Sequence, residues 1–302
     1  MLDLLSLRGQ LDPIRLTLDA RREGMRKLMR VAGTRVEVGS VEDRALPGPG
    51  GPLAIRIYTP AEMPGGASPG LVFFHGGGLV AGSLDTHDGL CRQLAAATCC
   101  RTVSVGYRLA PEHRFPAAIE DACAATAWVA DHAAEFGIVP ERIAVGGDSA
   151  GATLAAVVCQ WARERASPRI AAQLLLCPAL DFSRASASRR EFARGFLIDE
   201  AIMNGDMEHY LEPGTSLDDP RVSPLRTLDF AALPPAIVHT AEFDPLRDEG
   251  REYADRMAQA GVPVRHTCHA GMIHYFYAMG AAIPEAHSVL TAIGRELRDA
   301  LA

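Results

Sequence analysis

Short apolar runs alternate with longer helix-like stretches along most of the chain, a pattern typical of α/β folds. The apolar runs predict strands near residues 34–40, 53–59, 71–75, 101–107, 142–147, 172–178, 236–241 and 263–269. After the first two strands, helices are predicted near residues 85–98, 116–136, 150–164, 246–260 and 282–301. Because strands and helices alternate, we expect an eight-stranded, mostly parallel sheet with helices on both faces.

Two segments interrupt this alternation and are predicted to form a helical cap. Residues 1–33 are helix-like, and residues 181–230 are polar at first and then carry spaced large apolar side chains. A cap over the end of the sheet would supply an apolar wall for a small molecule. Residues 34–180 and 231–302 would then form the core. The alternative is that both segments are ordinary surface helices.

Ser149 lies in a Gly-x-Ser-x-Gly pattern between a predicted strand and a predicted helix. In that context the serine occupies a sharp turn, and the glycines two positions away on either side avoid side-chain clashes. The turn would expose the serine hydroxyl to a base and a substrate. Taken alone, the pattern also fits a loop that only joins a strand to a helix.

A glycine-rich loop, His75–Gly78, follows another short apolar strand. Backbone N–H groups in such a loop can stabilise the negative charge that develops on a carbonyl oxygen during acyl transfer. We expect the amides of Gly77 and Gly78, with that of Ala150, to form an oxyanion hole. Gly76 is the reserve donor, and His75 is expected to brace the loop. A flexible glycine turn is the alternative.

A serine nucleophile needs a base, usually histidine, and the histidine needs a carboxylate that fixes its tautomer. Asp244 follows the predicted strand 236–241, at the sheet edge where active-site groups gather in parallel sheets. His274 lies in the loop after the last strand and is the best candidate base. Asp248 is the main rival carboxylate, but it is predicted at a helix start, where a negative charge favours the helix dipole.

Five motifs occur together and in order, and they give the chain a family resemblance. They are His75–Gly78, Tyr107–His113, Gly147–Gly151, Asp244–Gly250 and Gly271–His274. Over roughly residues 35–300 the chain closely resembles the bacterial hormone-sensitive-lipase-like esterases of family IV. The resemblance implies an α/β-hydrolase core with a helical cap, a Ser149–Asp244–His274 triad, an oxyanion hole from the glycine loop and Ala150, and hydrolysis of short-acyl carboxylic esters.

Two positions depart from the pattern common in this family. Tyr275 and Ala152 stand where members often carry glycine. Neither change removes a catalytic group, but Tyr275 could narrow the alcohol or acyl pocket. We therefore expect Tyr275 to contact the substrate, together with Leu197 from the 181–230 segment that is expected to set substrate choice.

Composition and charge restrict the partners that we expect. A formal net charge of −7 and a pI near 5.8 argue against nucleic acid or an anionic membrane as the main partner. The start of the sequence has neither a basic leader nor a long apolar segment, so we expect a cytoplasmic protein without a membrane span. The seven cysteines show neither metal-ligand nor disulfide spacing, and we expect no metal and no cofactor.

The sequence thus favours a serine carboxylesterase that cleaves short- to medium-chain esters through an acyl-enzyme intermediate. An amide or formamide hydrolase of the arylformamidase type is an alternative. A non-catalytic small-molecule receptor is less favoured, because such receptors on this scaffold have lost the triad histidine that His274 provides. A homodimer through the last edge strand, near residues 263–269, is also considered, although Pro263 and Arg265 can protect an exposed edge.

Overall fold

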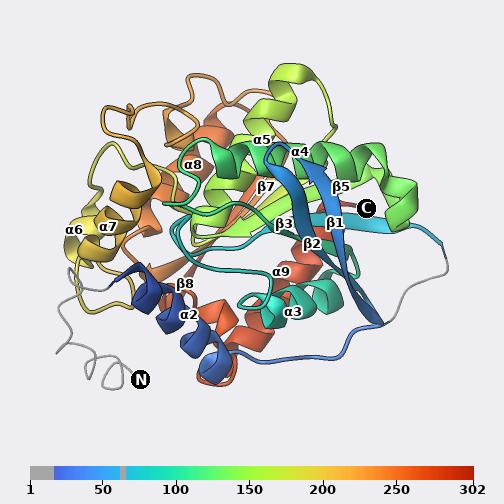
Figure 1. The fold of residues 1–302 in the computed structure, drawn as a ribbon, viewed down its shortest axis with the longest axis horizontal. Helices are drawn as coiled ribbons and strands as arrows, with labels where there is room; N and C mark the ends of the chain where they lie inside the picture. Colours follow the sequence, from blue (N-terminus) through green and yellow to red (C-terminus); the bar gives the residue numbers. More distant parts are fainter. Residues whose placement is uncertain (1–16, 62–65) are drawn as a thin grey trace.

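The structure, a computed structural model, describes residues 17–61 and 66–302 and contains one eight-stranded sheet (Figure 1). The order across the sheet is β1-β2-β4-β3-β5-β6-β7-β8, antiparallel between β1, β2 and β4 and parallel elsewhere. This confirms the predicted sheet. The strands are β1 (Ser40–Gly48), β2 (Gly51–Thr59), β3 (Ser68–Phe74), β4 (Arg101–Gly106), β5 (Ile138–Asp148), β6 (Ala172–Leu176), β7 (Ala236–Phe243) and β8 (Val264–Ile273).

Helices cover both faces of the sheet (Figure 1). On one face α3 (Asp88–Thr98) packs against α9 (Glu285–Ala300). The opposite face carries α4 (Ala117–Asp131), α5 (Ala150–Arg165) and α8 (Arg247–Gln259). Because the central strands are buried on both sides, they read as continuous apolar runs, such as the fully buried 71–74 of β3.

The first strand was predicted in the wrong place. Residues 34–39 form no strand, and β1 begins at Ser40. Most side chains of β1 are exposed and only Leu46 is buried, so the strand has no apolar alternation that the sequence could show. Its position depends instead on a tight hairpin to β2, in which Gly48 pairs with Gly51.

In the described part of the two segments predicted to form a cap lie the α-helices α2 (Leu18–Ala32), α6 (Ala187–Glu191) and α7 (Glu200–Tyr210) and the short 3-10 helix η3 (Pro224–Arg226). Residues 1–16 of the first segment lie outside the described residues. An ion pair of 3.1 Å between Arg21 Nη2 and Asp206 Oδ2 joins α2 to α7. Farther along the chain, Gln160 of α5 donates to the carbonyl of Pro224, so the end of the 181–230 segment packs on the core.

No helix in the described parts of the chain combines the length and the apolar character that crossing a bilayer requires.

Candidate active site

The turn from β5 into α5 positions Ser149. Its backbone has φ 54° and ψ −120°, an uncommon conformation for a non-glycine residue. The flanking glycines allow this turn: a Cβ on Gly147 would overlap the backbone of Gly151, and a Cβ on Gly151 would overlap the carbonyl of Phe74. The predicted reason for glycine at both positions is confirmed.

Asp244 and His274 approach Ser149 from the ends of two neighbouring strands. His274 Nε2 lies 3.0 Å from Ser149 Oγ, and His274 Nδ1 lies 2.8 Å from Asp244 Oδ2. Asp244 Oδ1 also accepts the backbone N–H of Leu246 at 2.8 Å, which fixes the carboxylate. Asp244 and His274 are completely buried, whereas Ser149 is 9% exposed. Ser149 is thus the member of this hydrogen-bond chain that keeps some exposure.

Asp248, the alternative carboxylate, does not contact His274. Asp248 lies in the first turn of α8, as predicted, and accepts the backbone N–H of Ser188 at 2.9 Å. Its other oxygen lies 3.1 Å from Arg247 Nε. Asp248 thus ties α6 to α8, and Asp244 is the carboxylate that contacts His274.

The glycine loop lies next to the serine turn. Gly76 N–H donates to Asp148 Oδ1 at 3.0 Å, so this reserve donor is already engaged. Gly77 has φ 122° and Gly78 has φ 67°, conformations that favour glycine. Ala150 begins α5, so its amide has no acceptor within the helix. The amides of Gly77, Gly78 and Ala150 stay the predicted oxyanion donors.

His75 braces the glycine loop, as predicted. Its Nδ1 lies 2.9 Å from the carbonyl oxygen of Gly76, and its ring stacks on Tyr107 with 4.2 Å between ring centroids. The Tyr107 hydroxyl donates to the carbonyl of His75 at 2.6 Å. Complete burial lowers the pKa of His75 to about 3, so the ring is neutral near pH 7.

Asp148 has a role that the sequence motifs above did not predict. It precedes the serine, is completely buried, and binds the loop through Gly76 N–H, while its Oδ2 lies 3.3 Å from His87 Nε2. One carboxylate therefore connects the serine turn with the glycine loop. An acidic side chain directly after the buried, uncharged run 143–147 was the available signal.

Asp206 is a second such residue, and it reaches the glycine loop from α7, in a segment predicted to form the cap. A Cβ on Gly78 would overlap the Asp206 carboxylate, which shows how closely α7 approaches the glycine loop. Burial raises the pKa of Asp206 to about 6, although Arg21 and His209 oppose the rise. An acidic group of the predicted cap therefore contacts the predicted oxyanion loop.

The two predicted pocket residues occupy different surroundings. Tyr275 has φ 65° and is almost completely buried, with its ring edge-on to His274 at 4.8 Å. Its hydroxyl lies against Gly76 and Asp148, so the side chain packs against the glycine loop and is not an exposed pocket wall. Leu197 is half-buried with φ 73°. Contact of either residue with a substrate stays a prediction.

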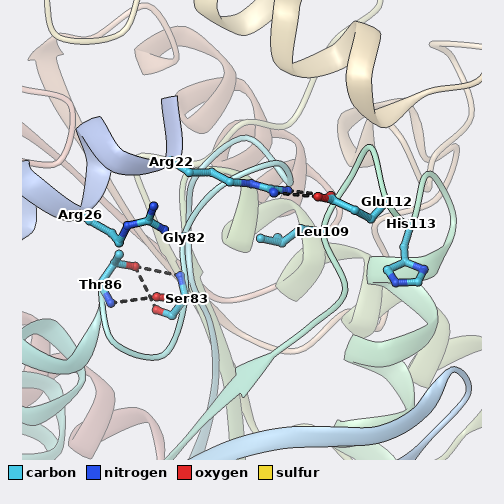
Figure 2. Close-up of a pocket in the computed structure, with 8 residues that line it drawn as sticks. All are labelled: Arg22, Arg26, Gly82, Ser83, Thr86, Leu109, Glu112 and His113. Carbon is cyan, nitrogen blue, oxygen red and sulfur yellow. Dashed lines mark hydrogen bonds and ion pairs between the residues drawn. The ribbon is translucent and has the colours of Figure 1, made fainter. Parts of the chain in front are cut away.

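A pocket of about 370 Å³ lies beside the loop that follows the glycines (Figure 2). No member of the Ser149 hydrogen-bond chain lines it. Figure 2 shows Arg22 of α2 directed toward Glu112, and Arg22 Nε also donates to the carbonyl of Val80 at 2.8 Å. Arg22 thus anchors α2 to the core. The lining residues are Arg22, Arg26, Gly82, Ser83, Thr86, Leu109, Glu112 and His113.

A serine on a strand–helix turn, followed in chain order by an aspartate and a histidine at later strand ends, defines the α/β-hydrolase class. Comparison of the sequence with known protein families narrows this class. The chain belongs to the alpha/beta hydrolase fold family whose model matches residues 71–278, and within it to the hormone-sensitive-lipase-like family IV.

Several relatives of known structure or curated name are similar over most of the chain. This chain is 46% identical over 238 residues to the carboxylic ester hydrolase LipN of Mycobacterium tuberculosis. The match covers 77% of this chain and 62% of LipN. Esterase LipI of the same organism is 41% identical over 278 residues, covering 91% and 87% of the two chains. An ester hydrolase from the metagenome of Lake Arreo, solved with a derivative of bipyridine phosphonate, is 39% identical with a TM-score of 0.95, covering 99% and 96%.

Proposed function

We propose that this chain is a serine carboxylesterase that cleaves short- to medium-chain carboxylic esters through an acyl-enzyme on Ser149. The observation that carries the proposal is the hydrogen-bond chain from Asp244 through His274 to Ser149, with distances of 2.8 and 3.0 Å. The names of the relatives, which are ester hydrolases and esterases, support an ester as the substrate.

Each side chain of this hydrogen-bond chain has a role in the proposed cycle. Ser149 donates its proton to His274 Nε2 as the hydroxyl oxygen attacks the ester carbonyl. His274 Nδ1–H points to Asp244, which holds the ring in the correct tautomer and stabilises its cation. Protonated His274 then gives its proton to the leaving alcohol, and a water molecule repeats the sequence on the acyl-enzyme.

The tetrahedral intermediate needs donors for its oxyanion. The amides of Gly77, Gly78 and Ala150 would supply them, and each fixed donor typically lowers such a barrier by about 3 kcal/mol. Asp148 supports this assignment, because it holds Gly76 and thereby fixes the position of the loop relative to Ser149.

We further propose that residues 1–33 and 181–230 form a cap over the site, with 34–180 and 231–302 as the catalytic core. The ion pair between Arg21 and Asp206 supports a single cap, since it joins the two segments next to Gly78. Leu197 and the apolar residues around it would line the part of the substrate pocket that holds the acyl chain.

The two alternative functions have less support. LipN, LipI and the Lake Arreo enzyme are all named as ester hydrolases or esterases, and none is named as an amide hydrolase. A non-catalytic receptor would lack the contact of His274 with Ser149. Comparing ester and N-formyl-aromatic substrates at equal concentration separates the first alternative from esterase activity.

The proposal is tested with p-nitrophenyl esters from acetate to long acyl chains, using wild type and Ser149→Ala. We expect hydrolysis that is fastest with short chains and absent in the variant. Wild-type-like hydrolysis by Ser149→Ala would contradict the mechanism, and an inactive wild type would contradict the function.

We also propose a cytoplasmic location and a homodimer that forms through β8. All seven cysteines are free, which suits a reducing compartment. Strand β8 lies at one edge of the sheet, where it can pair with a second copy. Light scattering on the purified protein would measure the mass of the assembly.

A further inference from the structure

A buried cysteine lies beside the Asp244–His274 pair. Cys177 directly follows β6 and is completely enclosed, with an exposed fraction of 1%. Its Sγ, one carboxylate oxygen of Asp244 and one ring nitrogen of His274 all lie within 4.8 Å of one another. Within residues 17–61 and 66–302, this is the one group of three such side chains close enough to share a metal ion.

The backbone fixes the thiol in this position. Cys177 has φ 42°, a left-handed conformation that a non-glycine residue adopts only where its surroundings hold it. Its N–H donates to the carbonyl of His239 at 2.7 Å, which continues the pairing of β6 with β7. Asp244 is held as firmly, because its other oxygen accepts the N–H of Leu246. The three donor atoms therefore come from fixed positions on three strand ends.

We propose that Cys177, Asp244 and His274 form an inhibitory site for a thiol-binding divalent cation of the Zn²⁺ or Cd²⁺ type. Thiolate, imidazole and carboxylate are the ligands that Zn²⁺ takes in proteins, at about 2.0–2.3 Å. Around one tetrahedral ion these donors lie about 3.3–3.8 Å apart. His274 Nδ1 and Asp244 Oδ2, now 2.8 Å apart, would have to separate by about 1 Å or less.

Binding of the cation would move the protons of Cys177 and His274 so that His274 no longer acts as a base. The Cys177 thiol releases one proton to solvent when its sulfur binds the cation. In neutral His274 the Nδ1 proton is replaced by the cation and is transferred to Nε2, so the ring stays neutral. An Nε2–H faces Ser149 as a donor and cannot accept the serine proton. One net proton is released per ion, and the base is lost.

Without a metal the cysteine leaves the triad undisturbed. Burial and the nearby Asp244 carboxylate raise the pKa of the Cys177 thiol well above its ordinary value, so the thiol is neutral. The site is therefore compatible with an active enzyme that a cation inhibits reversibly.

The experiment titrates chelator-treated protein with Cd²⁺ and follows two readouts. The first is the ultraviolet charge-transfer absorption of a Cd²⁺–thiolate bond, which needs no ester substrate and so does not depend on the proposed function. The second is residual ester hydrolysis, normalised to the metal-free activity of each variant. Cys177→Ser removes the soft ligand at nearly constant size, and Cys268→Ser removes an exposed thiol as a matched control.

We expect saturable absorption and inhibition in the wild type and in Cys268→Ser, reversed by chelator, with Zn²⁺ inhibiting in the same way. Cys177→Ser should need at least tenfold more Cd²⁺ for half inhibition and should lose the corresponding absorption. Equal sensitivity of Cys177→Ser and wild type, or a wild type that binds no Cd²⁺ through Cys177, would overturn the proposal. Thermal unfolding verifies that Cys177→Ser folds, and Cys177→Ala replaces it if it does not.

Discussion

At the residue scale, we expect Asp244 to act through His274, since its Oδ2 lies 2.8 Å from His274 Nδ1. In Asp244→Asn the amide would donate to Nδ1 and leave the proton on Nε2, the tautomer that cannot accept from Ser149. We expect kcat to fall by about 10³–10⁴-fold, less than in Ser149→Ala or His274→Ala. Steady-state kinetics on a short-chain ester, with circular dichroism as a check of folding, measures this. A fall below tenfold would show that Asp244 does not orient the base.

The serine turn gives a second prediction at this scale. Gly151→Ala places a methyl group on the carbonyl of Phe74, so we expect a loss of about 1–3 kcal/mol in stability and strongly reduced activity. Gly205 of α7 is the control, because a Cβ there meets nothing within 4 Å. Gly205→Ala should be neutral or stabilising by up to about 1 kcal/mol. Similar melting temperatures for the two variants would contradict the geometry of the turn.

At the element scale, the approach of α7 to the glycine loop should make stability depend on pH. The folded-state pKa of Asp206, about 6, lies above its ordinary value of 3.8. Its contribution to stability is therefore complete below about pH 4 and is lost as the pH rises through about 6. Asparagine does not ionise, so the free energy of unfolding of wild type minus that of Asp206→Asn should fall by about 2–3 kcal/mol between pH 4 and 8.

Urea unfolding of both proteins across this pH range provides the measurement. Asp218→Asn is the control, since that side chain is 77% exposed and its ion pair with Arg226 should contribute little to stability. A difference for Asp206 that is constant, or that rises with pH, would show that the carboxylate is not buried against the loop.

Elements with strong local signals were predictable from the sequence. The Ser149 turn follows from its two glycines, and the places of Asp244 and His274 follow from the strands that precede them. Strand β1 was misplaced because its exposed side chains carry no apolar alternation. The contacts of Asp206 and Cys177 were not predictable, because they join residues far apart in the chain and depend on how the helices and strand ends pack.

At the scale of the whole molecule, the parallel sheet brings the candidate catalytic residues together at the carboxyl ends of its strands. The glycine loop follows β3, Ser149 follows β5, Asp244 follows β7 and His274 follows β8. Parallel strands end at the same edge, so residues up to 200 positions apart meet there without a special connection. The ion pair between Arg21 and Asp206 joins α2 and α7, the two helices that we propose as part of a cap over these strand ends.

We propose above all that Ser149 is a nucleophile activated by His274. A p-nitrophenyl phosphonate reacts with such a serine and leaves a stable phosphonyl group on its oxygen, which intact-protein and peptide mass spectrometry can detect and locate. We predict one adduct per chain, located on Ser149, and at least about a hundredfold slower labelling of His274→Ala. An unlabelled wild type, labelling at another residue, or equally fast labelling of His274→Ala would contradict the claim.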